Sequence, residues 1–161
     1  MDAAQEAQLA RLVFSNHWAA LATVNGGKPL SSYVAYVPDG AGGLLVHISR
    51  LAKHTTNLLD NPQASLSISE VDMDGGDPQL LARVSLQGNV TVIDRDGEGF
   101  KSAQDRYIQA LPAAEQLFGF ADFLLFRFTI EQVRFVAGFG KSFTLSAETL
   151  WRIGAVNRLF P

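Results

Sequence analysis

Basic and hydroxyl side chains gather in residues 44–62, between a short apolar run and a segment with helical spacing. The apolar run predicts a strand that ends at Ser49, and the spacing of apolar residues over 51–59 predicts a helix that Asn61-Pro62 stops. A helix start presents unpaired N–H groups and the positive end of the helix dipole, which together favour an anion. Cationic and hydroxyl side chains at that point suit a phosphate group. The candidates are Ser49, Arg50, Lys53, His54 and Thr55.

The same side chains also fit a second interpretation, the solvated face of a surface helix, because charges are common at helix ends. Metal chemistry finds less support in the sequence. The three histidines (His17, His47 and His54) lack the paired spacing of a zinc site, and the absence of cysteine excludes thiolate ligands and thiol nucleophiles. We therefore expect no metal site, and no residue is indicated as a catalytic acid or base.

Length and composition favour one folded domain over residues 1–161, because 47% of the residues are hydrophobic and 18% are charged. A formal net charge of -3 gives no support for a nucleic-acid or anionic-membrane partner. The sequence shows no leader pattern and no apolar run of membrane-spanning length. We expect a cytoplasmic protein, which the lack of cysteine also fits.

The order of elements predicts a mainly β protein. Strands are expected at 18–24, 29–37, 44–48, 64–70 and 84–92, followed by a hairpin of 123–129 and 132–139. Helices are expected at 2–15, 96–111 and 112–118, so that 1–16 is an N-terminal helix and 146–161 a C-terminal tail. Six or seven strands joined by short turns, with helices inserted singly, indicate a nearly closed antiparallel barrel with peripheral helices.

One predicted strand is unusual in that it is apolar on both faces. Residues 123–128 carry a single charged residue, Arg127. In an antiparallel protein such a strand needs a cover on its outer face. A partner subunit is the simplest cover, and we expect one.

The sequence resembles the pyridoxamine-phosphate-oxidase-like FMN-binding split-barrel family, and within it the haem-utilisation (HugZ-type) branch. The resemblance spans residues 8–150 as an ordered series of short motifs. These are ALATV (20–24), GKP (27–29), SSY (31–33), IS (48–49), KHT (53–55), NL (57–58), NP (61–62), ARV (82–84) with Gly88, DF (122–123), FR (126–127), FV (135–136) and GFG (138–140).

The resemblance implies a six- to seven-stranded split barrel that binds FMN at the interface of a homodimer. By position, Ser49, Lys53 and His54 would hold the FMN phosphate, with Thr55 adjacent. The second strand would lie beside the isoalloxazine ring, and a further polar residue would come from the start of a later strand. The residues implied there are Ser31, Ser32, Tyr33 and Arg83. The function implied first is that of a flavin-dependent oxidoreductase whose substrate is unknown.

The haem-utilisation branch implies an alternative function, haem binding or haem degradation. Its haem-degrading members supply an iron ligand from a histidine in a C-terminal tail, whereas this sequence has no histidine after His54. A haem role then needs His17, His47 or His54 as the ligand, or a tail beyond this sequence. A third alternative is a non-catalytic flavin-binding protein.

Overall fold

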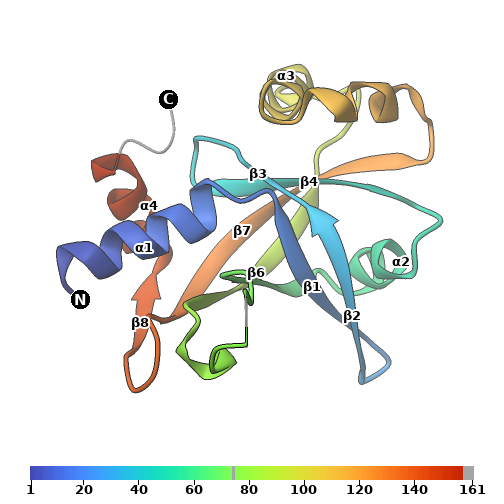
Figure 1. Ribbon diagram of the computed structural model, residues 1–161. Helices are drawn as coiled ribbons and strands as arrows, with labels where there is room; N and C mark the ends of the chain where they lie inside the picture. The colour runs from blue at the N-terminus through green and yellow to red at the C-terminus, as the bar shows by residue number, and fades with distance from the viewer. Residues whose placement is uncertain (74, 158–161) are drawn as a thin grey trace.

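Eight antiparallel strands form one sheet within residues 1–73 and 75–157, the part of the chain that the computed structural model describes. The strand order is β2-β1-β5-β6-β7-β4-β3, and β8 pairs with β7 (Figure 1). The bounds are β1 Trp18–Asn25, β2 Lys28–Ala35, β3 Val37–Pro38, β4 Gly43–Ser49, β5 Gln63–Ser69, β6 Arg83–Val92, β7 Phe123–Val136 and β8 Ser142–Ser146.

The sheet closes on itself through the extended segment 28–38. This segment pairs with β1 along β2 and then with β4 along β3, after Tyr36 leaves the ladder and donates its backbone N–H to the carbonyl of His17. The chain is therefore a split barrel, as its sequence predicted. Two short strands, β3 and β8, were not predicted as separate elements.

Apolar side chains fill the barrel because residues alternate between its inner and outer faces. One paired row crosses four strands through Leu21, Leu66, Leu86 and Val133. Each of these side chains is 2% exposed or less. The clean alternation in residues 64–70 thus predicted the correct inward face of β5.

The predicted hairpin of 123–129 and 132–139 is wrong, because β7 is a single strand of 14 residues. Its first half pairs with β4, its second half pairs with β8, and β6 runs beside most of its length. The register between β6 and β7 shifts at Gln87/Gly88, where Glu131 is skipped in the pairing. This bulge bends β7 where the sequence suggested a turn.

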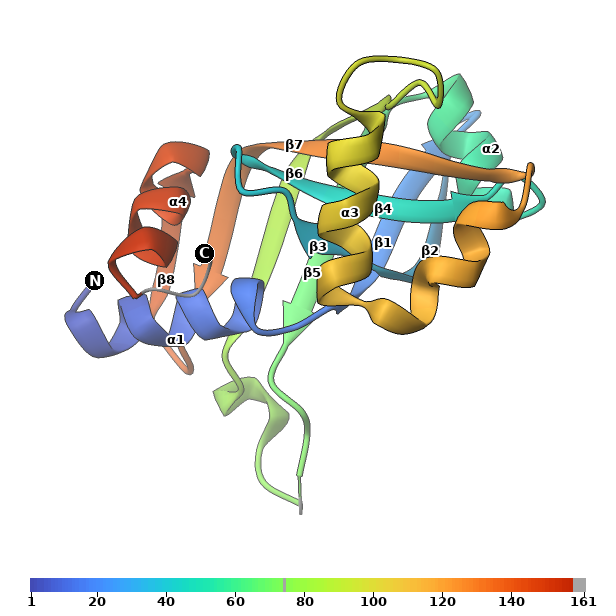
Figure 2. The same cartoon turned by 90° about the horizontal axis from the view of Figure 1, so that it is seen from above.

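The C-terminal segment is more ordered than a tail. Residues Ala147–Val156 form helix α4, which follows the N-cap Ser146 and buries Leu150 and Ile153 completely. Helix α4 packs beside α1 (Ala3–Phe14), as Figure 2 shows. The first turn of α1 carries a capping box between Asp2 and Gln5. Residues 158–161 of the predicted tail lie outside the described residues.

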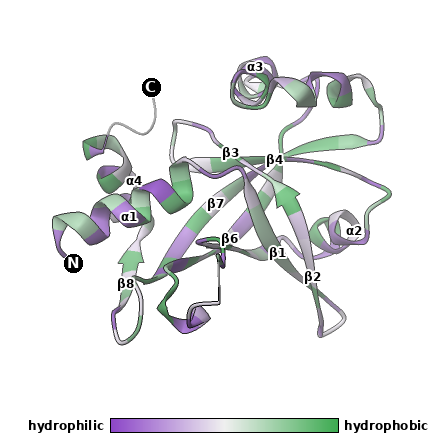
Figure 3. Cartoon of the chain, in the orientation of Figure 1, coloured by the Kyte–Doolittle hydropathy of each residue, from purple (hydrophilic) through white to green (hydrophobic). Residues whose placement is uncertain are grey.

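Only one face of helix α1 packs against the barrel. Hydrophobic and hydrophilic residues alternate along it in Figure 3. Leu9, Ala10, Leu12, Val13 and Phe14 are buried in the main core. No helix in the described part of the chain is long and apolar enough to cross a membrane.

The outer face of β4 and β7 is covered by the chain itself. Helix α3 (Phe100–Ala110) and the 3₁₀ helix η2 (Pro112–Gly119) bring Ala103, Tyr107 and Phe118 against Leu45 and Leu125. This second cluster explains why residues 123–128 are apolar on both faces. That strand therefore gives no reason to expect a partner subunit, and the homodimer stays a prediction on other grounds.

Candidate functional site

The junction between β4 and helix α2 (Lys53–Asp60) carries the residues that the sequence singled out for an anion. Helix α2 begins at Lys53, and its N-cap residue, Ala52, makes no side-chain capping bond. The predicted helix start at Leu51 is too early, since Leu51 lies before α2 and is 88% exposed. Lys53 is exposed, and no ion pair within residues 1–73 and 75–157 involves it.

Ser49 ends β4 with its hydroxyl group already bonded. Its Oγ donates to Asp122 Oδ2 at 2.6 Å and accepts the backbone N–H of Leu51 at 3.1 Å. The backbone N–H of Arg50 also donates to the carbonyl oxygen of Asp122, at 2.7 Å. Asp122 is thus part of the junction, although no pattern in the sequence assigned it there.

The polar residues on α2 differ in how far they are buried. His54 is half-buried, and this burial lowers its pKa from 6.5, so that the imidazole is neutral at pH 7. Thr55 is fully buried, and its Oγ1 has no hydrogen-bond partner among the described residues. Asn57 is also buried and donates from Nδ2 to Thr23 Oγ1 at 3.0 Å. This bond fixes α2 against β1.

Strand β2 divides the three residues predicted to lie beside a cofactor ring. Ser31 and Tyr33 point to the outer face, whereas Ser32 is paired with buried Leu21 and its Oγ is enclosed without a partner in the described chain. Tyr33 is 62% exposed and stacks on Trp18, which is 60% exposed, with ring centroids 5.6 Å apart and planes 14° apart.

Arg83 lies at the first position of β6 and is turned toward the loop before that strand. Its Nη1 donates to the carbonyl oxygens of Leu81 at 3.0 Å and Gln79 at 3.3 Å. The side chain is exposed. Within this single chain, its bonds hold it to the loop and leave it apart from the β4–α2 junction.

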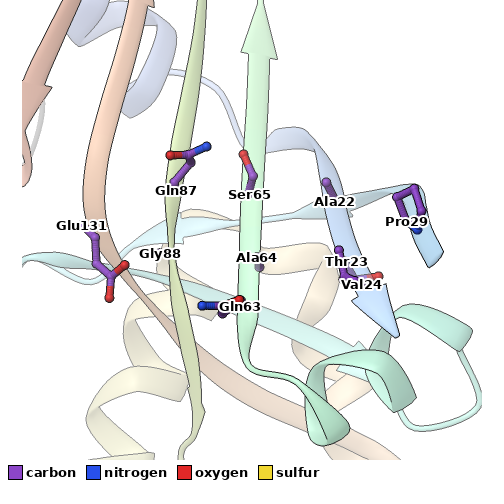
Figure 4. Close-up of a pocket in the computed structure, with 10 residues that line it drawn as sticks. All are labelled: Ala22, Thr23, Val24, Pro29, Gln63, Ala64, Ser65, Gln87, Gly88 and Glu131. Carbon is purple, nitrogen blue, oxygen red and sulfur yellow. The ribbon is translucent and has the colours of Figure 1, made fainter. Parts of the chain in front are cut away.

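The outer face of β2, β1, β5 and β6 is lined mostly with small side chains. One paired row consists of Ser31, Ala22, Ser65 and Gln87, and the next consists of Tyr33, Ala20, Ser67 and Ser85. Strands are spaced about 4.8 Å apart, so each row spans roughly 14 Å. A groove of about 380 Å³ lies on this face, with Ala22, Ser65 and Gln87 among its walls (Figure 4).

The three histidines differ sharply in their access to a ligand. His47 is 5% exposed, lies among aromatic rings under α3 and η2, and has a pKa lowered to about 4 by burial and by Arg95. His17 uses Nδ1 in a contact of 3.1 Å with the Tyr36 carbonyl oxygen. His54 alone among them lies at the β4–α2 junction. The described residues hold no cluster of three or more metal-ligating side chains.

Comparison with known proteins identifies the family of this chain. The family profile for pyridoxamine 5'-phosphate oxidase matches residues 5–137, which include β1 to β7 and the whole junction. The chain belongs to the pyridoxamine 5'-phosphate oxidase family. The resemblance read from the short motifs is confirmed at this level.

Two proteins similar in sequence to this chain are haem oxygenases by name. The chain is 32% identical to the haem oxygenase HutZ of Vibrio cholerae over 135 residues, which are 81% of this chain and 74% of HutZ. It is 33% identical over 123 residues to a chloroplastic protein of Arabidopsis thaliana, the non-canonical haem oxygenase HOZ, covering 76% of this chain and 36% of HOZ.

Two of the similar solved structures are of haem proteins. A haem-binding protein from Mycobacterium smegmatis has a TM-score of 0.79 at 29% identity, and the match covers 97% of this chain but 61% of that one. The crystal structure of HutZ, described there as a haem storage protein, has a TM-score of 0.71 at 27% identity, with 83% of this chain and 94% of HutZ covered.

Proposed function

We propose that this protein binds haem against the outer face of β1, β2, β5 and β6. The observation that carries the proposal is the groove on this face, which mostly small side chains line and the exposed Trp18–Tyr33 stack borders. A planar macrocycle can pack against small side chains and stack with aromatic rings at its edge. Similarity to HutZ and to the mycobacterial haem-binding protein supports haem as that macrocycle.

The residues at the β4–α2 junction, which do not line the groove, carry a cation and an imidazole that haem could use. Lys53 offers an unpaired cation for a propionate, and His54 offers a neutral imidazole, the form that binds iron. Bound haem would supply redox chemistry at its iron. We propose binding rather than one fate for the haem, because HutZ is described both as an oxygenase and as a storage protein.

We also propose a homodimer, cytoplasmic in location, in which a second copy packs over the same face. Trp18, Tyr33 and Val24 are exposed apolar residues on its strands, as an interface would require. A copy on this face would enclose the ligand and exclude water from it. Sedimentation that showed a stable monomer at micromolar concentration, with and without haemin, would contradict this part of the proposal.

FMN is the second candidate, as the cofactor of an oxidoreductase or of a non-catalytic flavin protein. It is favoured by the uncapped start of α2, where backbone N–H groups and Lys53 could receive a phosphate. FMN would supply hydride or electron transfer at its ring. The bond between Ser49 and Asp122 opposes it, because a carboxylate already occupies the hydroxyl group that would serve the phosphate.

The location of the site can be tested by filling the face. Ala22 is exposed, so A22W should fold normally and reduce haemin affinity at least tenfold by filling the groove on this face. Q109W places the same ring on exposed Gln109 of α3, outside the face, and should bind haemin like the wild type. Equal haemin affinity in both variants would remove the face from the proposal.

A further inference from the structure

The Ser49 hydroxyl group has a single proton, and it donates that proton in a hydrogen bond to Asp122. The distance of 2.6 Å from Oγ to Asp122 Oδ2 is that of a strong bond to a charged acceptor. The oxygen of the same hydroxyl group accepts from Leu51 N–H. A phosphate that needed the Ser49 proton would have to break the bond to Asp122 first.

Asp122 also puts a negative charge at the junction that no cation in the described chain neutralises by an ion pair. The aspartate is held in place from its backbone as well, since its carbonyl oxygen accepts from Arg50 N–H at 2.7 Å. Arg50 and Lys53 are both exposed, and neither forms an ion pair with Asp122 in the described chain. A phosphate dianion next to Ser49 would therefore meet a carboxylate at close range.

We infer that Asp122 makes the β4–α2 junction reject a phosphate dianion, so that Asp122 determines which ligands of the family this chain accepts. The inference builds on the proposed function, since haem has carboxylates and no phosphate. A propionate carries one charge and can pair with Lys53 without the Ser49 proton, whereas a phosphate carries close to two charges and gains most from that proton.

Two flavins that differ only by the phosphate separate the charge effect from binding of the ring. We would measure the dissociation constants of FMN and riboflavin for the wild type and for D122N by quenching of flavin fluorescence. The amide side chain of D122N keeps an acceptor for Ser49 and removes the charge. We expect D122N to bind FMN at least tenfold more tightly than the wild type and to bind riboflavin unchanged.

Two further variants control the comparison. S49A retains the carboxylate and should show no gain in FMN affinity. D105N removes an exposed carboxylate on α3 that pairs with Lys101, outside the junction, and should also show no gain. FMN affinity that stays the same in D122N, including undetectable binding in both proteins, would overturn the inference. An equal gain for riboflavin would overturn it as well.

Measuring haemin affinity in the same proteins distinguishes failure of this inference from failure of the proposed function. If the wild type fails to bind haemin but D122N gains FMN selectively, haem binding is wrong and the role of Asp122 stands. If haemin binds and D122N gains nothing for FMN, the role of Asp122 is wrong and haem binding stands.

Discussion

The imidazole ring of His47 lies face to face with the phenyl ring of Phe118, with centroids 3.8 Å apart and planes 7° apart. Tyr107 meets the same imidazole edge-on, at 5.9 Å. These contacts fasten η2 and α3 to β4, on the side of the barrel away from its main core. Neither ring nitrogen of His47 has a hydrogen-bond partner among the described residues, so this contact depends on a neutral imidazole.

Acid should therefore destabilise the fold through His47. Its pKa of about 4 in the folded chain lies below 6.5, the ordinary value expected in the unfolded chain, so the unfolded state binds the proton more tightly. Arg95 adds repulsion to the charged form, and Tyr107, whose pKa is raised to about 12, stays neutral. The stability that this group contributes is present above pH 6.5 and is lost as pH falls to 4, by up to about 3 kcal/mol.

Urea unfolding of the wild type and H47F at a series of pH values measures this loss. H47F keeps an aromatic ring against Phe118 and cannot be protonated, so its stability should fall less steeply between pH 6.5 and 4. Parallel curves for the two proteins would show that His47 does not carry the acid sensitivity.

Tyr36 should stabilise the end of α1. Its hydroxyl group is buried and donates to the carbonyl oxygen of Val13, in the last turn of that helix, at 2.8 Å. Y36F would leave this buried carbonyl without its donor and should lower the free energy of unfolding by about 1–2 kcal/mol. Y33F removes the hydroxyl group of an exposed tyrosine and should change it by less than about 0.5 kcal/mol. Equal stability of Y36F and the wild type would contradict the assignment.

Strands β6 and β7 approach each other so closely at Gly88 that we expect only glycine to fit there without strain. A Cβ atom at this position would lie 1.9 Å from the carbonyl oxygen of Thr129, a backbone atom that cannot turn aside. G88A should therefore cost about 3 kcal/mol of stability. G119A adds the same methyl group where nothing lies within 4 Å, and its midpoint of thermal unfolding should stay close to that of the wild type. Equal midpoints for G88A and G119A would show that the two strands can move apart at no cost.

Local patterns in the sequence predicted most of the barrel, because an alternation such as that of Leu66 and Ile68 is set within one strand. The continuity of β7 could not be read in this way. It depends on the bulge opposite Gln87 and Gly88, and hence on pairing with a strand much earlier in the chain. The cover of β7 by α3 and η2 depends on packing between distant segments for the same reason.

In the candidate site, too, local sequence predicted some residues, whereas others depend on contacts between distant segments. Lys53, His54 and Thr55 follow Ser49 within a few residues, so a single stretch of sequence placed them at one junction. Asp122 reaches that junction only because Ser49 pairs with Phe123, across 73 residues of chain from Ser49 to Asp122. The alternation of β2 also turns Ser32 away from Ser31 and Tyr33, which the motif alone did not distinguish.

The Trp18–Tyr33 stack should contribute to ligand affinity more than to stability. Both rings are largely exposed, so W18A should lower the free energy of unfolding by less than about 1 kcal/mol. Loss of the ring at the edge of the face should weaken haemin binding by up to about tenfold, the equivalent of about 1.4 kcal/mol. An unchanged haemin dissociation constant in W18A would place the ligand elsewhere.

The most direct test of the account is a haemin titration of the purified protein followed by absorption spectroscopy and desalting, with FMN titrated in parallel. The account predicts a Soret band that saturates with haemin and survives desalting, together with weak or no retention of FMN. Haemin that shows no saturable Soret band, or a flavin spectrum that survives desalting while haemin does not, would contradict it.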